Sequence, residues 1–181
     1  MPTIAHYPPE FRTKITRLPV TERVKLATRL TWDDVREIRK RWQGEIIIKG
    51  ILNPDDADRA LVVGADGIVV SNHGARNMDS APAAIEVLPR ICDRIGKKLT
   101  VLADSGVHRG SDVVKYLAAG AKAVLVGRAP LYGASAAGES GAAHVFALLR
   151  EELDHCLAFT GQQSVASVSR DLIWHSTYWS R

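Results

Sequence analysis

The sequence has few cysteines, few aromatic residues and no long hydrophobic run, and each shortage excludes a class of protein. Only two cysteines, Cys92 and Cys156, occur among the 181 residues, and they lack the spacing of metal ligands. This excludes a disulfide framework and favours a reduced, cytoplasmic setting, in which we expect both thiols to be buried rather than reactive. No stretch of about 18 apolar residues could form a membrane-spanning helix. We expect no secretory signal, because the first residues lack an apolar core.

The composition is that of one globular domain, with 46% hydrophobic and 24% charged residues. The net charge is +4, from 24 Lys and Arg against 20 Asp and Glu, and ten of the basic residues lie between Arg12 and Arg41. We interpret this stretch as a solvated surface, with an acidic partner or an anionic membrane face as alternatives. Nucleic acid is not expected as a partner, because aromatics make up only 6% and do not interleave with the basic residues.

Four short, nearly continuous apolar runs with many β-branched residues predict strands. Strands buried on both faces have this pattern, so the runs predict a parallel sheet. They are Glu45–Lys49, Gly67–Ser71, Leu99–Ala103 and Ala123–Val126.

The segments between these runs have the spacing of amphipathic helices. Asn53 and Pro54 provide a cap and a first-turn proline for the first of them. Upstream, Thr31 begins a helix with Val35, Ile38 and Trp42 on one face. The expected inward stripes are Ala57, Ala60 and Leu61; Ala84, Leu88, Ile91 and Ile95; Val113, Val114, Leu117 and Ala118; and Val145, Leu148, Leu149, Leu153, Cys156 and Leu157.

The alternation of strands and helices predicts an α/β fold of the TIM (β/α)8-barrel type. A faint repeat, in which Gly64-Ala65 and Gly120-Ala121 each end a helix just before a strand, indicates short loops with a left-handed glycine. Polar and glycine-rich residues follow every strand, which favours a barrel over a doubly wound sheet. About four βα units cannot close an eight-stranded barrel. We therefore expect a basic loop over residues 1–30 and the C-terminal half of a barrel over residues 31–181.

Two of the loops after strands have the composition of an anion site. Gly127-Arg128 follows the last strand, where barrels commonly bind phosphate through backbone amides and a cation. The previous strand ends in Asp104, Ser105 and Gly106, which offer a hydroxyl-binding carboxylate and backbone donors, with Arg109 as a second cation. Together they predict a ligand with both a polyol and a phosphate, although a surface arginine and ordinary helix capping are the alternatives.

Two further residues are candidates for acid–base chemistry and substrate binding. His73 follows a strand, and Arg76 lies three residues later; imidazole can accept a proton near neutral pH, and guanidinium grips a carboxylate at two points. This pair suits a carboxylic acid that loses a proton beside its carboxylate. Lys49 ends an apolar strand, where an ammonium group needs an anionic or electron-rich partner such as a cofactor. A structural histidine and a solvated lysine remain the alternatives.

From about Thr31 to Ile173 the chain resembles the FMN-dependent α-hydroxy-acid dehydrogenases and oxidases, the family of glycolate oxidase, L-lactate dehydrogenase and (S)-mandelate dehydrogenase. The most specific match is the run Ser-Asn-His-Gly-Ala-Arg at residues 71–76. Three other stretches occur in the family's order and spacing, namely Ile48–Gly50, Asp104–Asp112 and Gly127-Arg128.

The resemblance implies FMN as the cofactor and a small 2-hydroxy acid as the substrate. His73 would be the catalytic base and would contact the substrate, and Arg76 would hold its carboxylate. Lys49 would lie near the flavin and stabilise its reduced form, Asp104 would bind the ribityl hydroxyls, and Gly127 and Arg128 the phosphate. The full set of implied cofactor contacts is Lys49, Ser71, Asp104, Ser105, Gly106, Val107, His108, Arg109, Gly127 and Arg128.

The chain departs from the family in two respects. His108-Arg109 stands where the family usually has two consecutive arginines, which weakens the positive field near the flavin unless His108 is protonated. The first four barrel strands, with their substrate and flavin contacts, have no counterpart. Residues 1–30 correspond to the variable loop before the fifth strand, which attaches some members to the membrane, so peripheral contact with the inner membrane is a further expectation.

We therefore expect oxidation of an (S)-2-hydroxy acid, of mandelate or lactate type, by a site that is incomplete in this chain alone. A complementary N-terminal half or a homo-oligomer would be its protein partner, because an open half-barrel leaves strand edges unpaired. The alternative is a non-catalytic half-barrel that binds FMN or phosphate. A barrel of the IMP-dehydrogenase type is disfavoured, because the cysteines lie in helical segments.

Overall fold

The computed structural model describes residues 30–174 of the chain. They belong to two compact units, which are described separately: the first ends at Trp42 and the second begins at Gln43. The basic segment predicted as a loop lies outside the described residues apart from Leu30. The division of the chain at residue 30 therefore stays a prediction.

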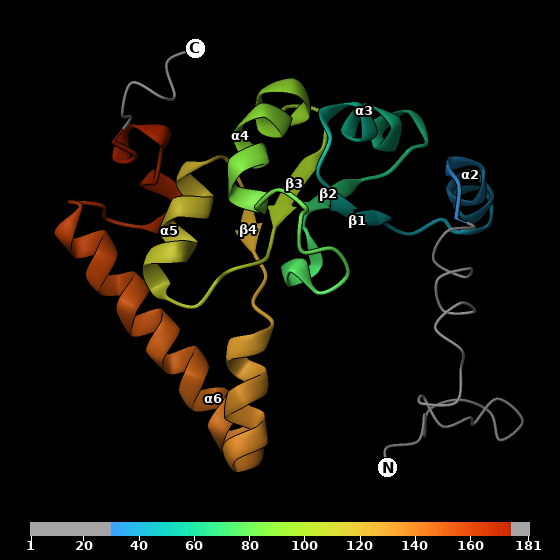
Figure 1. The fold of residues 1–181 in the computed structure, drawn as a ribbon. Coiled ribbons are helices and arrows are strands. Elements are labelled where there is room, and N and C mark those ends of the chain that lie inside the picture. Colours follow the sequence, from blue (N-terminus) through green and yellow to red (C-terminus); the bar gives the residue numbers. More distant parts are fainter. Residues whose placement is uncertain (1–29, 175–181) are drawn as a thin grey trace, which may run out of the picture. The chain divides into compact units, whose positions relative to one another are not determined.

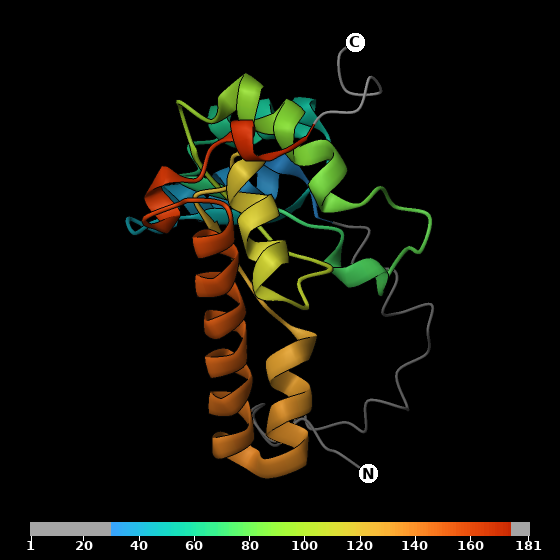
Figure 2. The ribbon, with the colours of Figure 1, turned by 90° about the vertical axis from the view of Figure 1, so that its left-hand side faces the viewer.

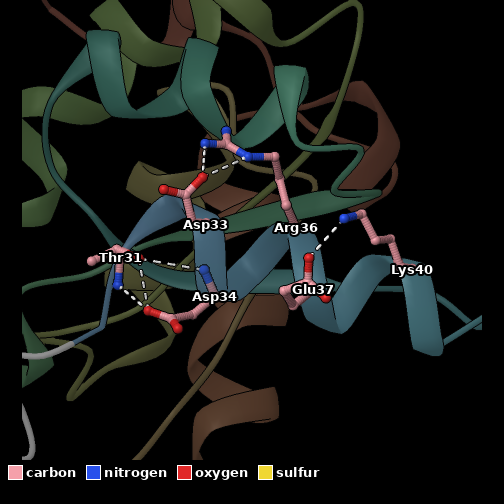
Figure 3. Close-up of polar contacts among 6 residues, drawn as sticks. All are labelled: Thr31, Asp33, Asp34, Arg36, Glu37 and Lys40. Carbon is pink, nitrogen blue, oxygen red and sulfur yellow. Dashed lines mark hydrogen bonds and ion pairs between the residues drawn. The ribbon is translucent and has the colours of Figure 1, made fainter.

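The described part of the first unit is helix α2, Trp32–Arg41, which begins where the sequence predicts it. Thr31 forms a capping box: its hydroxyl accepts a hydrogen bond from the Asp34 amide at 3.4 Å, and the Asp34 carboxylate accepts one from the Thr31 amide at 2.7 Å (Figure 3). Ion pairs Arg36–Asp33 and Lys40–Glu37 lie along the helix. These local contacts stabilise a helix that buries none of its residues.

The second unit is built on a four-stranded sheet (Figure 1). All neighbouring strands are parallel, in the order β1-β2-β3-β4, and the predicted strand positions are confirmed to within two residues at each end. An order that follows the sequence without reversal is that of a barrel rather than a doubly wound sheet. The strands are Ile47–Ile51, Gly67–Val70, Thr100–Ala103 and Ala123–Val124.

Burial on both faces, predicted for every strand, holds only for β2, all of whose residues are buried. On β1 the Ile47 side chain is 48% exposed, and on β4 Ala123 is exposed and Val124 half-buried. The prediction was wrong for β1 and β4, which are the edges of the described sheet, and partly wrong for β3, where Thr100 is exposed and Leu102 half-buried because β4 pairs only with the last two residues of β3. An edge strand has one neighbour, so its apolar side chains are covered from one side only.

Helices α3 (Pro54–Val62) and α4 (Ala84–Ile95) follow the first two strands and lie beside each other (Figure 1). The Asn53 side chain accepts from the Asp55 amide at 2.9 Å, so the predicted cap is confirmed. The whole predicted stripe of α4 is buried. On α3, Ala57 and Ala60 are buried and Leu61 is half-buried. These side chains form the core against β2 and β3.

The predicted inward stripe of helix α5 (Gly110–Ala118) is confirmed in part. Val114 and Ala118 are buried as expected, but Val113 and Leu117 are only half-buried, and Tyr116 is buried instead. The reason is that α5 packs against both the sheet and α6, so its covered surface is wider than one apolar stripe. The turn to β4 contains Gly120 at φ +112°, the left-handed glycine that the repeat predicts.

Helix α6 (Arg128–Phe159) has two arms joined by a kink at Ala137 and Gly138 (Figure 2). The arms approach closely through Gly133 and Gly141: a Cβ atom on Gly141 would lie 2.0 Å from the Gly133 carbonyl oxygen. Of the stripe predicted here, Leu149 and Leu157 are buried, whereas Leu148 is 46% exposed. The predicted burial of this stripe is therefore only partly confirmed, because much of the second arm extends past the sheet and α5.

Short 3₁₀ helices complete the described chain. Beyond α6 come η4 (Val165–Ser167) and η5 (Arg170–Leu172). Arg170 forms an ion pair with Asp93 at 2.6 Å and thereby attaches η5 to α4. The two cysteines are half-buried rather than buried as predicted; Cys92 lies against the turn at Gly120. Within residues 30–174, no helix is long and apolar enough to cross a membrane.

Candidate functional site

A cavity of about 430 Å³ lies at the carboxyl ends of the strands. Every site residue predicted from the sequence lines it except Ser71 and Arg109. Loops that follow β1, β2, β3 and β4 all contribute, as expected when parallel strands end at one edge of a sheet. The lining residues are Lys49, His73, Gly74, Arg76, Asp104, Ser105, Gly106, Val107, His108, Leu125, Val126, Gly127, Arg128 and Leu131.

Lys49, Ser71 and Asp104 connect three strands at the floor of this site. The Lys49 ammonium donates to the Ser71 hydroxyl at 2.7 Å and forms an ion pair with the Asp104 carboxylate at 2.8 Å. Burial acts to raise the pKa of Asp104, but hydrogen bonds from Lys49, Ser71 and Ser105 outweigh it and hold the pKa below its ordinary value. Asp104 is therefore a carboxylate, and Ser71 reaches the site through Lys49.

His73 lies in the tight turn η3, His73–Ala75, which directly follows β2. Its three residues have positive φ angles, of 57° for His73, 67° for Gly74 and 59° for Ala75. The Ser71 hydroxyl accepts from the His73 amide at 3.0 Å, and the Asn72 side chain accepts from the Ala75 amide at 3.2 Å. Side chains from the preceding residues thus hold a strained backbone that presents His73 at the cavity.

The loop after β3 is also strained and is bonded to the histidine turn. Ser105 and Gly106 have φ angles of 79° and 71°. The Ser105 hydroxyl accepts from the Gly74 amide at 3.1 Å and donates to Asp104 at 2.7 Å. Consequently the position of the His73 turn depends on Ser105.

Tyr116 is a structural member of this site that the sequence analysis missed. Its hydroxyl lies 2.5 Å from the Ser105 carbonyl oxygen and 3.0 Å from that of Asp104. The one signal in the sequence was a hydroxyl-bearing side chain between the apolar residues of α5.

Positive charge dominates the cavity. Lys49, Arg76 and Arg128 line it with two histidines, and Asp104 is the only acidic residue among the lining side chains. Gly127 and Arg128 begin α6, so the positive end of a helix dipole is added there. The Arg128 guanidinium lies over Gly74: a Cβ atom on that glycine would be 3.5 Å from Nη2. Such a cavity is suited to an anionic ligand.

Arg109 lies elsewhere, at the start of α5. Its guanidinium forms an ion pair with Glu152 of α6 at 3.1 Å, and the other oxygen of Glu152 accepts from the Gly110 amide at 2.8 Å. Asp112 accepts from the backbone amides of His108 and Arg109, each at 3.1 Å. These contacts fix the loop that leads away from the cavity, and a cofactor contact of Arg109 stays a prediction.

The residues fit a cofactor with a phosphate and a polyhydroxylated chain. Arg128 and the start of α6 suit a phosphate. Asp104 is a hydroxyl acceptor, and Gly106 has open space where a Cβ would lie. A flavin mononucleotide has both of these groups. The site thus lies at the mouth of a barrel-type sheet and combines a histidine with two arginines, a lysine and one carboxylate.

Comparison with known proteins agrees with this description. The family model for FMN-dependent dehydrogenases matches residues 11–175, and the chain belongs to this family.

Two curated relatives are close in sequence. The L-lactate dehydrogenase of Azorhizobium caulinodans is 49% identical over 78% of this chain and 37% of its own length. An FMN-dependent alpha-hydroxy acid dehydrogenase of Penicillium citrinum is 47% identical over 82% of this chain and 37% of its own length. The chain thus spans little more than a third of the length of either relative.

Solved structures give the same result for the fold. The structure of the monotopic membrane protein (S)-mandelate dehydrogenase matches with a TM-score of 0.78 and 39% identity, over 91% of this chain and 45% of the other. A soluble mutant of the membrane-associated (S)-mandelate dehydrogenase from Pseudomonas putida matches with a TM-score of 0.77 and 40% identity. The four βα units are therefore part of a (β/α) barrel.

Proposed function

We propose that this chain provides the base, the carboxylate clamp and the phosphate cradle for FMN-dependent oxidation of an (S)-2-hydroxy acid to a 2-oxo acid. The single observation that carries the proposal is the cavity that His73, Arg76, Lys49, Asp104 and Arg128 share. Mandelate and lactate are the substrate types that the similar proteins suggest, because these acids name them.

The chemistry requires the substrate to lose two electrons and two hydrogens. Arg76 binds the substrate carboxylate by a two-point contact and so fixes the hydroxyl-bearing carbon near His73. The imidazole of His73 accepts the proton of the substrate hydroxyl as the C–O single bond becomes a carbonyl. FMN, if bound there, would supply the acceptor for the remaining hydrogen and its two electrons.

The other residues bind and orient the cofactor. Arg128 and Gly127 would hold its phosphate, Asp104 its ribityl hydroxyls, and Lys49 would place positive charge where the reduced ring carries negative charge. Ser71 accepts a hydrogen bond from Lys49 and would thereby fix the position of the Lys49 ammonium group relative to the cofactor. Ser105 to Arg109 would border the ribityl-phosphate arm. His108 adds to the positive field only when it is protonated.

Catalysis is proposed to need further barrel units from a complementary chain. The support is the sheet itself, in which β1 and β4 each have one neighbouring strand among the described residues. An open edge of this kind accepts another strand. A homo-oligomer could meet the same need.

The test is the absorbance spectrum of the purified chain, alone and co-expressed with the N-terminal half of the similar (S)-mandelate dehydrogenase. We expect a flavin band that (S)-mandelate or (S)-lactate bleaches in the co-expressed sample, with (R)-mandelate as the negative control. A flavin band that no hydroxy acid bleaches in either sample would favour the alternative, a non-catalytic half-barrel that binds FMN. No flavin band in either sample would contradict both readings.

We further propose peripheral contact with an anionic membrane. The basic residues between Arg12 and Arg41 support it, as does the description of a similar protein as a monotopic membrane protein.

The test is sedimentation with lipid vesicles. The chain should sediment with vesicles that contain phosphatidylglycerol and not with phosphatidylcholine vesicles, and salt should release it. Replacing Arg39, Lys40 and Arg41 by glutamine should weaken the binding. Equal recovery with both kinds of vesicle would contradict the proposal.

A further inference from the structure

Tyr116 contacts the backbone of Asp104 and Ser105, two residues that line the cavity. The tyrosine lies on α5 and is only 4% exposed; it does not line the cavity of about 430 Å³ but lines a neighbouring pocket, which Ser105 and Gly106 also line. Its hydroxyl lies within hydrogen-bond distance of two successive carbonyl oxygens, of Asp104 at 3.0 Å and of Ser105 at 2.5 Å. Both carbonyls belong to the turn that follows β3.

These contacts determine where two amide groups point. In a trans peptide the carbonyl and the next N–H point in opposite directions, and the described residues contain no cis bond. Because the Asp104 and Ser105 carbonyls face Tyr116, the N–H groups of Ser105 and Gly106 point away from it. Both residues line the cavity, and neither amide has an acceptor within residues 30–174. Two adjacent donors are thus available to a ligand.

The turn needs such support because Ser105 has a φ of 79°. A non-glycine residue in this region is strained, so without external contacts the turn would relax. Relaxation would also move the Ser105 hydroxyl away from the Gly74 amide, 3.1 Å distant, and so release the histidine turn.

We propose that Tyr116 is a positioning residue, whose hydroxyl fixes the turn after β3 so that the Ser105 and Gly106 amides donate to a bound phosphate group. The identity of the anion as the phosphate of FMN rests on the proposed function. Burial, with the nearby carboxylates of Asp104 and Asp112, raises the pKa of Tyr116 to about 12. The hydroxyl therefore keeps its proton at physiological pH.

The test compares FMN with riboflavin, which lacks the phosphate, in the variant Tyr116→Phe. This change keeps the buried ring and removes only the hydroxyl. Fluorescence titration of the full chain should show a dissociation constant for FMN raised about tenfold, the loss of roughly one hydrogen bond. The constant for riboflavin should change by less than about twofold. Equal weakening of both ligands, or of neither, would overturn the proposal.

The control is Tyr132→Phe, since Tyr132 is 64% exposed on α6 and does not line the cavity. It should leave both constants unchanged. Amide hydrogen exchange on the ligand-free chain gives a second readout: the Gly74 amide should exchange about tenfold faster in Tyr116→Phe. If the wild-type chain binds neither flavin, the proposed function fails, and the exchange rate alone decides the role of Tyr116. An unchanged exchange rate of the Gly74 amide in Tyr116→Phe would overturn the proposed role of Tyr116.

Discussion

The ammonium group of Lys49 lies 2.8 Å from the carboxylate of Asp104, although Lys49 belongs to β1 and Asp104 follows β3. The pair spans the end of β2, where the Ser71 hydroxyl joins it at 2.7 Å from the ammonium. One charge pair thus ties three strand ends together at the floor of the cavity. Loss of either partner should loosen the histidine turn, because the Ser71 hydroxyl also accepts from the His73 amide.

The first prediction concerns Asp104 and acid stability. Its folded-state pKa lies below the ordinary value of 3.8, so ionised Asp104 stabilises the fold above that pH. This contribution is lost as the pH falls through the lower, folded-state pKa. Asp104→Asn should therefore reduce the free energy of unfolding at neutral pH by about 1 kcal/mol and flatten its decline below about pH 4.

Urea unfolding across this pH range measures the effect. Asp79→Asn is the matched control, because Asp79 is exposed and no ion pair is found for it within residues 30–174. It should follow the wild-type curve. If the free energy of unfolding of Asp104→Asn fell with decreasing pH as steeply as that of the wild type, Asp104 would contribute no acid-sensitive stability.

The second prediction concerns His73 as the base. His73→Ala should lower kcat about 10²- to 10⁴-fold in the co-expressed enzyme, the range lost with a general base. The flavin band should remain, because the predicted phosphate and ribityl contacts come from other loops. Stopped-flow reduction of the flavin by the hydroxy acid isolates this step. The control is His144→Ala, at an exposed position of α6 outside the cavity. In this variant the hydroxy acid should reduce the flavin at the wild-type rate. If the flavin were reduced at the wild-type rate in His73→Ala, His73 would not be the group that accepts the proton.

Local patterns in the sequence predict much of this fold and site. Apolar runs gave β2 and β3, and the stripe of α4 is buried as predicted, because hydrophobic period reflects which face of an element is covered. The loops after strands could be grouped since the ends of parallel strands share an edge. This grouping is what brings Lys49, His73 and Arg128 to one cavity.

The remainder depends on tertiary contacts that no local pattern encodes. Ser105 has a positive φ, and its carbonyl oxygen accepts a hydrogen bond from Tyr116, which is 11 residues away. The exposure of Ile47 follows from the position of β1 at a sheet edge. The kink of α6 depends on the close approach of Gly133 and Gly141.

The third prediction concerns the contact between α5 and α6. A Cβ atom on Gly110 would lie 2.1 Å from the Leu153 amide nitrogen, and backbone atoms cannot yield as a flexible side chain can. Gly110→Ala should therefore separate the helices and lower the free energy of unfolding by about 3 kcal/mol. Gly161→Ala is the control: Gly161 has φ +70° and open space, so it should cost only about 1 kcal/mol of backbone strain. Equal losses in urea unfolding would refute the close packing at Gly110.

The last prediction concerns Cys92, which lies against the turn at Gly120: a Cβ on that glycine would be 2.9 Å from Sγ. Burial raises the pKa of the Cys92 thiol to about 11, although the positive charge of Arg170 partly opposes this. Since only the thiolate is alkylated, Cys92 should react slowly at neutral pH. In a Cys156→Ala background, the iodoacetamide rate should rise with a midpoint near pH 11 for the folded chain. In urea the midpoint should fall to about 9.0, and a folded-state midpoint at that lower value would show that the thiol is not desolvated.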